Sequence, residues 1–100
     1  MMMTGPLCRA ARALVEISRA KLARVSGIEE SVIEAFERKL ARPDDETIGQ
    51  LKASLEELGA IFIPEDNRGA GVRLKFTQSE RRRIATLEGE GGIVGHDDVP

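Results

Sequence analysis

Residues 18–37 read SRAKLARVSGIEESVIEAFE, and this stretch decides the fold. Ser18 is a good helix N-cap, and Leu22 and Ala23 give the residues that follow it an apolar side. Gly27 can adopt the left-handed backbone conformation that ends a helix in a tight turn. The stretch therefore predicts a helix of about two turns, closely followed by a second helix.

The second helix of this pair is expected to be amphipathic. Its apolar residues fall at i, i+1, i+4 and i+8 and form an inward stripe: Val32, Ile33, Phe36 and Leu40. Its outward face is polar and carries Glu30, Ser31, Glu34 and Arg38. Pro43 cannot continue a helix, so we expect it to stop this one.

Helices are also predicted on both sides of the pair. Before it, Thr4 and Pro6 mark a helix start, and apolar residues then recur at helical spacing: Leu7, Ala10, Ala11, Leu14 and Val15. After it, Asp44 or Asp45 caps a fourth helix that Gly59 ends. The buried stripe of that helix is expected to be Ile48, Leu51, Leu55 and Leu58. Residues 4–59 thus predict a mainly α domain of four helices.

The periodicity changes after Gly59. Residues 60–63 form a short β-prone run, residues 64–71 are rich in turn formers, and apolar and polar residues then alternate. This pattern predicts a β-hairpin over residues 60–77, and its expected apolar contacts are Ile61, Ile63, Val72, Leu74 and Phe76. Residues 78–100 are expected to form a short helix and a disordered tail.

Composition excludes several classes of protein. The chain has 100 residues, enough for one domain, and its 41% hydrophobic and 32% charged residues are typical of a soluble protein without a membrane span. With 3% aromatic residues and no Trp or Tyr, it lacks a stacking platform for single-stranded nucleic acid. The net charge of −2 is unevenly distributed. Basic residues dominate residues 9–39, so any DNA-facing surface must come from the first half.

Cysteine and histidine usage points to a cytoplasmic protein without catalytic chemistry. Cys8 is the single cysteine, so no internal disulfide is available, and no signal-peptide pattern precedes it. A lone cysteine on a helix is interpreted as a small core residue rather than a nucleophile. The only histidine, His96, lies in the expected tail, and no phosphate-binding glycine loop or metal-ligand spacing is present. The sequence therefore predicts no enzyme activity, metal or cofactor.

The order of short helix, glycine turn and second helix resembles the Cro/repressor-type (XRE-like) helix-turn-helix family of transcription regulators. The resemblance runs over residues 7–59 and is carried by Leu22, Ala23, Gly27, Ile33 and Glu37. Residues 61–76, with FIPEDNRGAGVRLKF at their core, also look like a C-terminal extension found in short regulators of this family. The resemblance implies a lambda-repressor-like helix-turn-helix bundle followed by a hairpin, with double-stranded DNA as the partner.

The same resemblance implies roles for individual residues. Ser18 and Arg19 match the start of the second helix, which lies against a DNA phosphate. The third helix takes the recognition role, with groove-facing residues first and backbone-contacting residues after them. The full expected DNA-binding set is Arg9, Ser18, Arg19, Glu29, Glu30, Ser31, Glu34, Arg38 and Lys39. Arg12 and Glu37 match a structural ion pair between the first and third helices.

The sequence departs from the family at the recognition positions, which usually hold Gln, Arg, Asn, Ser or Thr. Here they hold three glutamates, which DNA phosphates would repel, although one Glu can accept from cytosine N4 for about 1–3 kcal/mol. An i,i+4 pair of Glu34 with Arg38, and the placement of Glu29 or Glu30 at the positive end of a helix, would relieve part of this repulsion.

Two hypotheses for function follow. The first is a DNA-binding regulator that dimerises through its fourth helix and hairpin, and the basic residues Arg9, Arg19, Arg24 and Lys39 favour it. The second is an anti-repressor or antitoxin-like module that binds a regulatory protein partner, and the acidic helix favours it.

Overall fold

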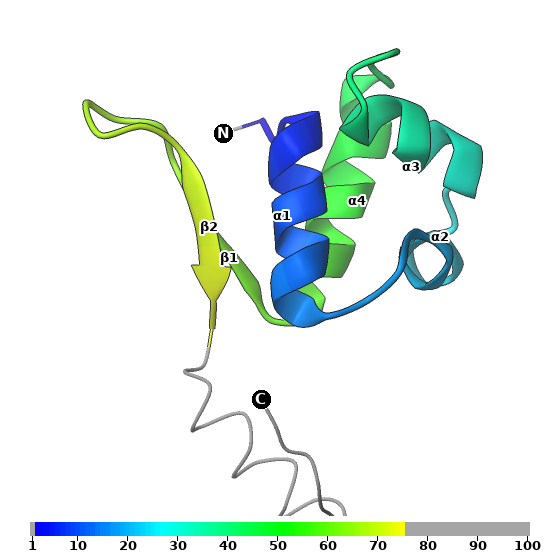
Figure 1. Ribbon diagram of the computed structural model, residues 1–100, viewed down its shortest axis with the longest axis horizontal. Coiled ribbons are helices and arrows are strands. Elements are labelled where there is room, and N and C mark those ends of the chain that lie inside the picture. The colour runs from blue at the N-terminus through cyan, green and yellow to red at the C-terminus, as the bar shows by residue number, and fades with distance from the viewer. Residues whose placement is uncertain (1, 76–100) are drawn as a thin grey trace, which may run out of the picture.

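A computed structural model of the chain describes residues 2–75 and contains four helices followed by two antiparallel strands (Figure 1). The elements are α1 (Gly5–Val15), α2 (Arg19–Ser26), α3 (Glu30–Glu37), α4 (Asp45–Glu57), β1 (Ala60–Ile63) and β2 (Gly71–Leu74). The predicted mainly helical fold with a hairpin is confirmed at this level. Phe76 and Thr77 of the expected hairpin, and the helix and tail expected over residues 78–100, lie outside the described residues.

Three helices begin where the sequence places a capping side chain. The Thr4 hydroxyl accepts a hydrogen bond from the backbone N–H of Leu7, and the Ser18 hydroxyl accepts one from Lys21 N–H at 3.0 Å. At α4 the cap is Asp44, which accepts from Thr47 N–H at 2.9 Å. Each cap satisfies an N–H group that has no partner within the first turn of its helix.

A single core joins the helices to the hairpin. Figure 1 shows α1 and α4 side by side at the centre, with α2 and α3 on one side of them and the hairpin on the other. The core contains Met3, Cys8, Ala11, Val15, Leu22, Ile33, Phe36, Ile48, Leu51, Leu55, Ala60 and Phe62. Because Ala60 and Phe62 belong to this cluster, the hairpin packs on the helices. An isolated two-stranded hairpin would be only marginally stable in water.

The third helix is shorter than the sequence predicted. It ends at Glu37, well before Pro43, and Lys39 then adopts a left-handed conformation with φ of 62°. The Leu40 N–H donates to the carbonyl of Ala35 at 2.8 Å, which closes the helix end. The chain therefore turns away from the helix axis, and Leu40, expected to be buried, is 69% exposed. That expectation was wrong.

The faces of α4 and β1 also differ from the prediction. Leu58, expected in the buried stripe of α4, follows the helix as its C-cap and is 37% exposed. In β1 the buried residues are Ala60 and Phe62, whereas Ile61 is half-buried and Ile63 is exposed. Successive side chains along a strand point to opposite faces. The expected inner residues, Ile61 and Ile63, are offset by one position from the observed ones, so the two faces of β1 are exchanged.

The pairing of the strands completes the inner face of the hairpin. Ala60 lies opposite Leu74 and Phe62 opposite Val72, and directly opposed residues share a face. Val72 and Leu74 pack against the core, as expected.

Met3 is a core residue that the sequence reasoning missed. It precedes the Thr4 cap and is 1% exposed, and Cys8 in the first turns of α1 is fully buried. An apolar residue before the cap that packs with one at the fourth helical position is a hydrophobic staple, which sets the direction in which the chain enters the helix.

Within residues 2–75, every helix falls short of the length and apolar character that a membrane span needs.

Candidate functional site

The helix pair α2 and α3 is joined by a turn of defined geometry. Gly27 ends α2 with φ of 77°, and the Ser26 hydroxyl accepts from Ile28 N–H at 3.1 Å. The Gln50 side chain of α4 donates to the carbonyl of Ser26 at 3.2 Å. These contacts hold the end of α2 against α4 and set the direction in which α3 begins.

The start of α3 is polar and exposed. Glu29, Glu30 and Ser31 are all exposed, whereas Ile33 and Phe36 on the other side of the helix are buried. Glu29 occupies the N-cap position, but its side chain makes no capping hydrogen bond. The predicted amphipathic helix is therefore present, and its first turn offers carboxylates and a hydroxyl to solvent.

The predicted ion pair between Arg12 and Glu37 is present and is bidentate. Arg12 Nε donates to Glu37 Oε2 and Arg12 Nη2 to Oε1, both at 2.7 Å. The Glu37 side chain is 1% exposed, and Cys8 Sγ donates to Oε2 at 3.3 Å. The pair ties α1 to the last residue of α3. Cys8 is fully buried in the core, as its sequence context indicated.

Two pKa shifts follow from this arrangement. Burial, and after it the adjacent charge of Glu37, raises the pKa of the Cys8 thiol, so the thiol stays protonated at neutral pH. The hydrogen bond to Glu37 raises the pKa of Arg12. Neither shift favours a thiolate nucleophile at Cys8.

Arg19 and Arg38 both contact Glu34. Arg19 Nη1 lies 3.5 Å from Glu34 Oε1, and Arg38 Nη1 lies 3.1 Å from Glu34 Oε2, which confirms the predicted i,i+4 pair. Arg19 Nε also lies 3.4 Å from Glu37 Oε1, but without hydrogen-bond geometry. Arg19, expected on a DNA phosphate, therefore rests against the carboxylates of α3, with its side chain 30% exposed.

The remaining expected site residues are distributed around this surface. Ser18 is exposed and caps α2, and Lys39 is exposed just beyond α3. Arg9 is exposed on α1, outside the helix pair. Two exposed cations of α2, Lys21 and Arg24, were not in the expected DNA-binding set, although Arg24 was among the basic residues that favoured DNA binding. They lie near the site because α2 is one of the two helices of the pair, and their spacing in the sequence did not indicate this.

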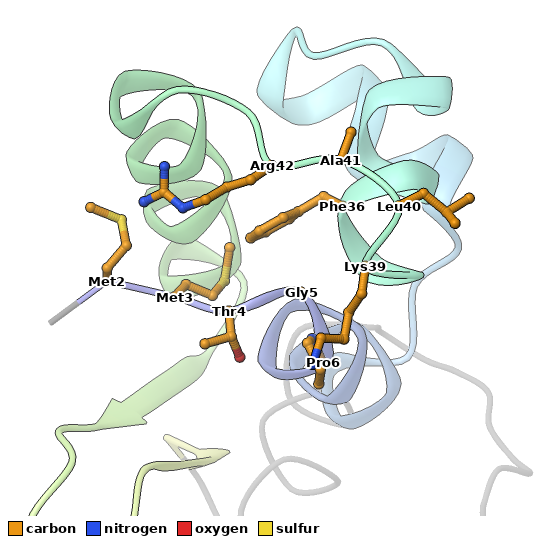
Figure 2. A pocket seen from close by; sticks show the side chains of 10 residues that line it. All are labelled: Met2, Met3, Thr4, Gly5, Pro6, Phe36, Lys39, Leu40, Ala41 and Arg42. Atoms are coloured by element: carbon orange, nitrogen blue, oxygen red, sulfur yellow. The ribbon is translucent and has the colours of Figure 1, made fainter.

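A groove that the sequence did not indicate opens between the N-terminal segment and the loop after α3 (Figure 2). Its volume is about 730 Å³, and its lining includes Met2, Met3, Phe36, Lys39, Leu40 and Arg42. Arg42 pairs with Asp45 at 2.8 Å. Three methionines in a row at the N-terminus were the only signal available, and they carry no periodicity from which a groove could be predicted.

Residues 2–75 contain no cluster of three or more His, Cys, Asp or Glu side chains that could hold a metal ion. Neither the known protein-family models nor the curated proteins include a match to this chain.

Proposed function

We propose that the chain is a sequence-specific DNA-binding transcription regulator of the Cro/repressor-like helix-turn-helix type, which acts in the cytoplasm as a homodimer. The observation that carries the proposal is the pair α2 and α3, joined through Gly27, with the polar first turn of α3 exposed. In helix-turn-helix proteins the first residues of the second helix contact base edges in the major groove. In this proposal α3 takes that role.

The cations around the pair support phosphate contacts. Arg38 and Lys39 are exposed at the end of α3, and Lys21 and Arg24 are exposed on α2. The N-terminus of α2, capped by Ser18, adds backbone N–H groups and the positive end of a helix dipole. Arg19 joins these contacts through guanidinium N–H donors that its pairing with Glu34 leaves free, and Arg9 extends the set onto α1.

The glutamates of α3 have two distinct tasks in this proposal. Glu29 and Glu30, exposed at the helix start beside Ser31, reach base edges, where a carboxylate selects cytosine N4. Glu34 lies between the guanidinium groups of Arg19 and Arg38 and is thereby largely compensated. The uncompensated negative charge at the interface is then confined to the first turn of α3.

A second candidate function is a protein-interaction module that keeps this fold without binding DNA. The observation that favours it is the exposed acidic start of α3, where the Glu29 side chain makes no capping contact and remains available to a partner. A basic patch on a regulatory protein would complement it.

Selection from a pool of random DNA duplexes, followed by salt titration of the selected sequence, tests the proposal. A specific duplex should emerge at physiological salt. Lys39→Gln should weaken binding to all duplexes similarly and reduce the slope of log affinity against log salt by about one unit. Arg68→Gln in the exposed hairpin loop changes the charge equally and serves as the control, with an unchanged slope.

Glu30→Gln separates the two candidate functions. If Glu30 contacts a base, the variant should lose preference at one position by about 1–3 kcal/mol while its general affinity rises through reduced repulsion. If no duplex binds specifically at physiological salt, the DNA-binding proposal fails and the protein-interaction module takes its place.

A further inference from the structure

The groove beside the N-terminus has an apolar floor and an apolar rim. Met3 and Phe36 are 1% and 5% exposed and form its base, whereas Met2 and Leu40 at its edges are 44% and 69% exposed. Figure 2 shows the Phe36 ring pointing between the N-terminal segment and Arg42. A volume of about 730 Å³ lies within the range of small-molecule sites, which is roughly 300–1,000 Å³.

Within residues 2–75, the charged groups of the groove are all positive. Among the described residues that line it, Lys39 and Arg42 carry a charge and none is acidic. Arg42 is already paired with Asp45, but Lys39 makes no ion pair with any described residue. The N-terminus of α1, at Thr4 and Gly5, also borders the groove and adds the positive end of a helix dipole.

The wall of the groove is held by close backbone packing. A Cβ added to Gly5 would collide with the backbone carbonyl oxygen of Phe36, so the first turn of α1 is pressed directly against the end of α3. The groove is therefore formed between two firmly docked elements, one of which is the proposed recognition helix.

We propose that this groove binds a small amphipathic carboxylate, with its apolar body against Met3 and Phe36 and its carboxylate at the Lys39 ammonium. Lys39 is the one unpaired cation among the described lining residues, and it balances a single negative charge, which favours a monocarboxylate over a phosphate. The site does not depend on the proposed function. One consequence does rest on the proposed function: Lys39 is also the proposed phosphate contact, so the ligand and DNA would compete for the same ammonium group.

Methionine methyl resonances offer a direct test, because the three methionines of the chain are residues 1–3 and two of them line the groove. The protein, labelled at its methionine methyl carbons, is titrated with octanoate in the absence of DNA. Methyl shifts of Met2 and Met3 that saturate are expected. Acetate, which has the charge without the chain, should leave the methyl resonances in place, and octanamide, which has the chain without the charge, should bind about fourfold more weakly.

Matched lysine variants locate the carboxylate. Lys39→Gln should weaken octanoate binding about fourfold, as expected for loss of one exposed ion pair, whereas Lys21→Gln on α2 should leave it unchanged. The proposal is overturned if octanoate moves neither methyl group, if octanamide binds as tightly as octanoate, or if Lys39→Gln binds like the wild type. Because the titration contains no DNA, these results are independent of whether the chain binds a duplex.

Discussion

Glu37 is the buried carboxylate on which the contacts between α1, α2 and α3 converge. Its side chain accepts two hydrogen bonds from Arg12 and one from Cys8, and the Arg19 guanidinium lies against it. A buried charge is tolerated only where such partners compensate for lost hydration. The arrangement orients the end of α3 against α1. It also means that Arg12 and Glu37 each need the other to compensate for lost hydration.

Removal of one member of the Arg12–Glu37 pair should therefore cost more than removal of both. Glu37→Ala leaves the Arg12 guanidinium, which is 13% exposed, without its carboxylate and should lower the free energy of unfolding by about 3–5 kcal/mol. The double variant Arg12→Met, Glu37→Met should lose less. Urea unfolding measures the difference, and equal stability of Glu37→Ala and wild type would contradict this role.

Cys8 should make the stability of the protein fall at high pH. Burial and the nearby Glu37 raise the pKa of its thiol above the ordinary value near 9.0. Above that pH the unfolded chain releases the thiol proton while the folded protein retains it. The unfolded state then binds fewer protons, so the free energy of unfolding decreases as pH rises.

The Cys8→Ser variant checks this pH dependence, because serine keeps a donor for Glu37 without titrating in this range. Urea unfolding from about pH 8 to pH 10.5 should give a flatter decline for Cys8→Ser than for the wild type, which is expected to lose up to about 1.4 kcal/mol per pH unit from this group. Parallel declines in the two proteins would show that Cys8 does not contribute.

At the scale of the elements, two helices end with a non-glycine residue in the left-handed conformation. Glu16 follows α1 and Lys39 follows α3, each with φ of 62°. In both cases the next residue donates its N–H back into the helix, from Ile17 to Arg12 and from Leu40 to Ala35. Glycine is the usual residue at this position, because a side chain is strained there.

Glycine at either position should stabilise the fold. Glu16→Gly and Lys39→Gly should each raise the free energy of unfolding by about 0.5–1 kcal/mol, since relief of left-handed strain exceeds the entropy that glycine loses. Ala53→Gly in the exposed interior of α4 is the control and should lower it by about 1 kcal/mol. Thermal and urea unfolding would measure all three, and a destabilised Lys39→Gly would contradict the strain at this residue.

At the scale of the whole molecule, the hairpin and the α2–α3 pair lie on opposite sides of α1 and α4 (Figure 1). The outer face of the hairpin carries Ile61, Ile63 and Arg73, and among residues 2–75 each strand of this two-stranded sheet keeps one unpaired edge. A second copy that joined at α4 and the hairpin would leave both α2–α3 surfaces free, as a dimeric DNA-binding protein requires.

Ile63→Lys should shift the proposed dimer toward monomer. It places a charge on the outer face of the hairpin, where Ile63 is 38% exposed, and leaves the core residues Ala60 and Phe62 in place. Val25→Lys on α2, where the side chain is 46% exposed, is the matched control and should not alter the assembly state. Sedimentation velocity distinguishes these outcomes, and a wild-type monomer at about tens of micromolar would contradict the dimer.

Sequence reasoning succeeded at several positions where the deciding interaction was local. The caps at Thr4, Ser18 and Asp44 and the turn at Gly27 are set by side chains within three residues of the groups they serve. The Glu34–Arg38 pair follows from helical spacing alone. Arg12 and Glu37 are separated by 25 positions, and a family resemblance, not spacing, predicted their contact.

The errors arose where competing local patterns are resolved by packing. Periodicity placed Leu40 and Leu58 on buried faces, but it carries no information on where a helix actually ends. In β1, the isoleucines and the pair Ala60 and Phe62 offered alternative inner faces with similar alternation, and packing against α1 and α4 selected the second.

Within residues 2–75, the sequence by itself determined the number, type and order of the elements and the charge on each exposed surface, because these depend on composition, capping and period. Only the tertiary structure decided which cationic side chains form ion pairs with described residues and which do not. Glu34 and Glu37 of α3 engage Arg19, whereas Lys39 stays unpaired among the described residues beside a groove that Met3 and Phe36 form. Such pairings depend on distances between residues far apart in the chain, which no local pattern encodes.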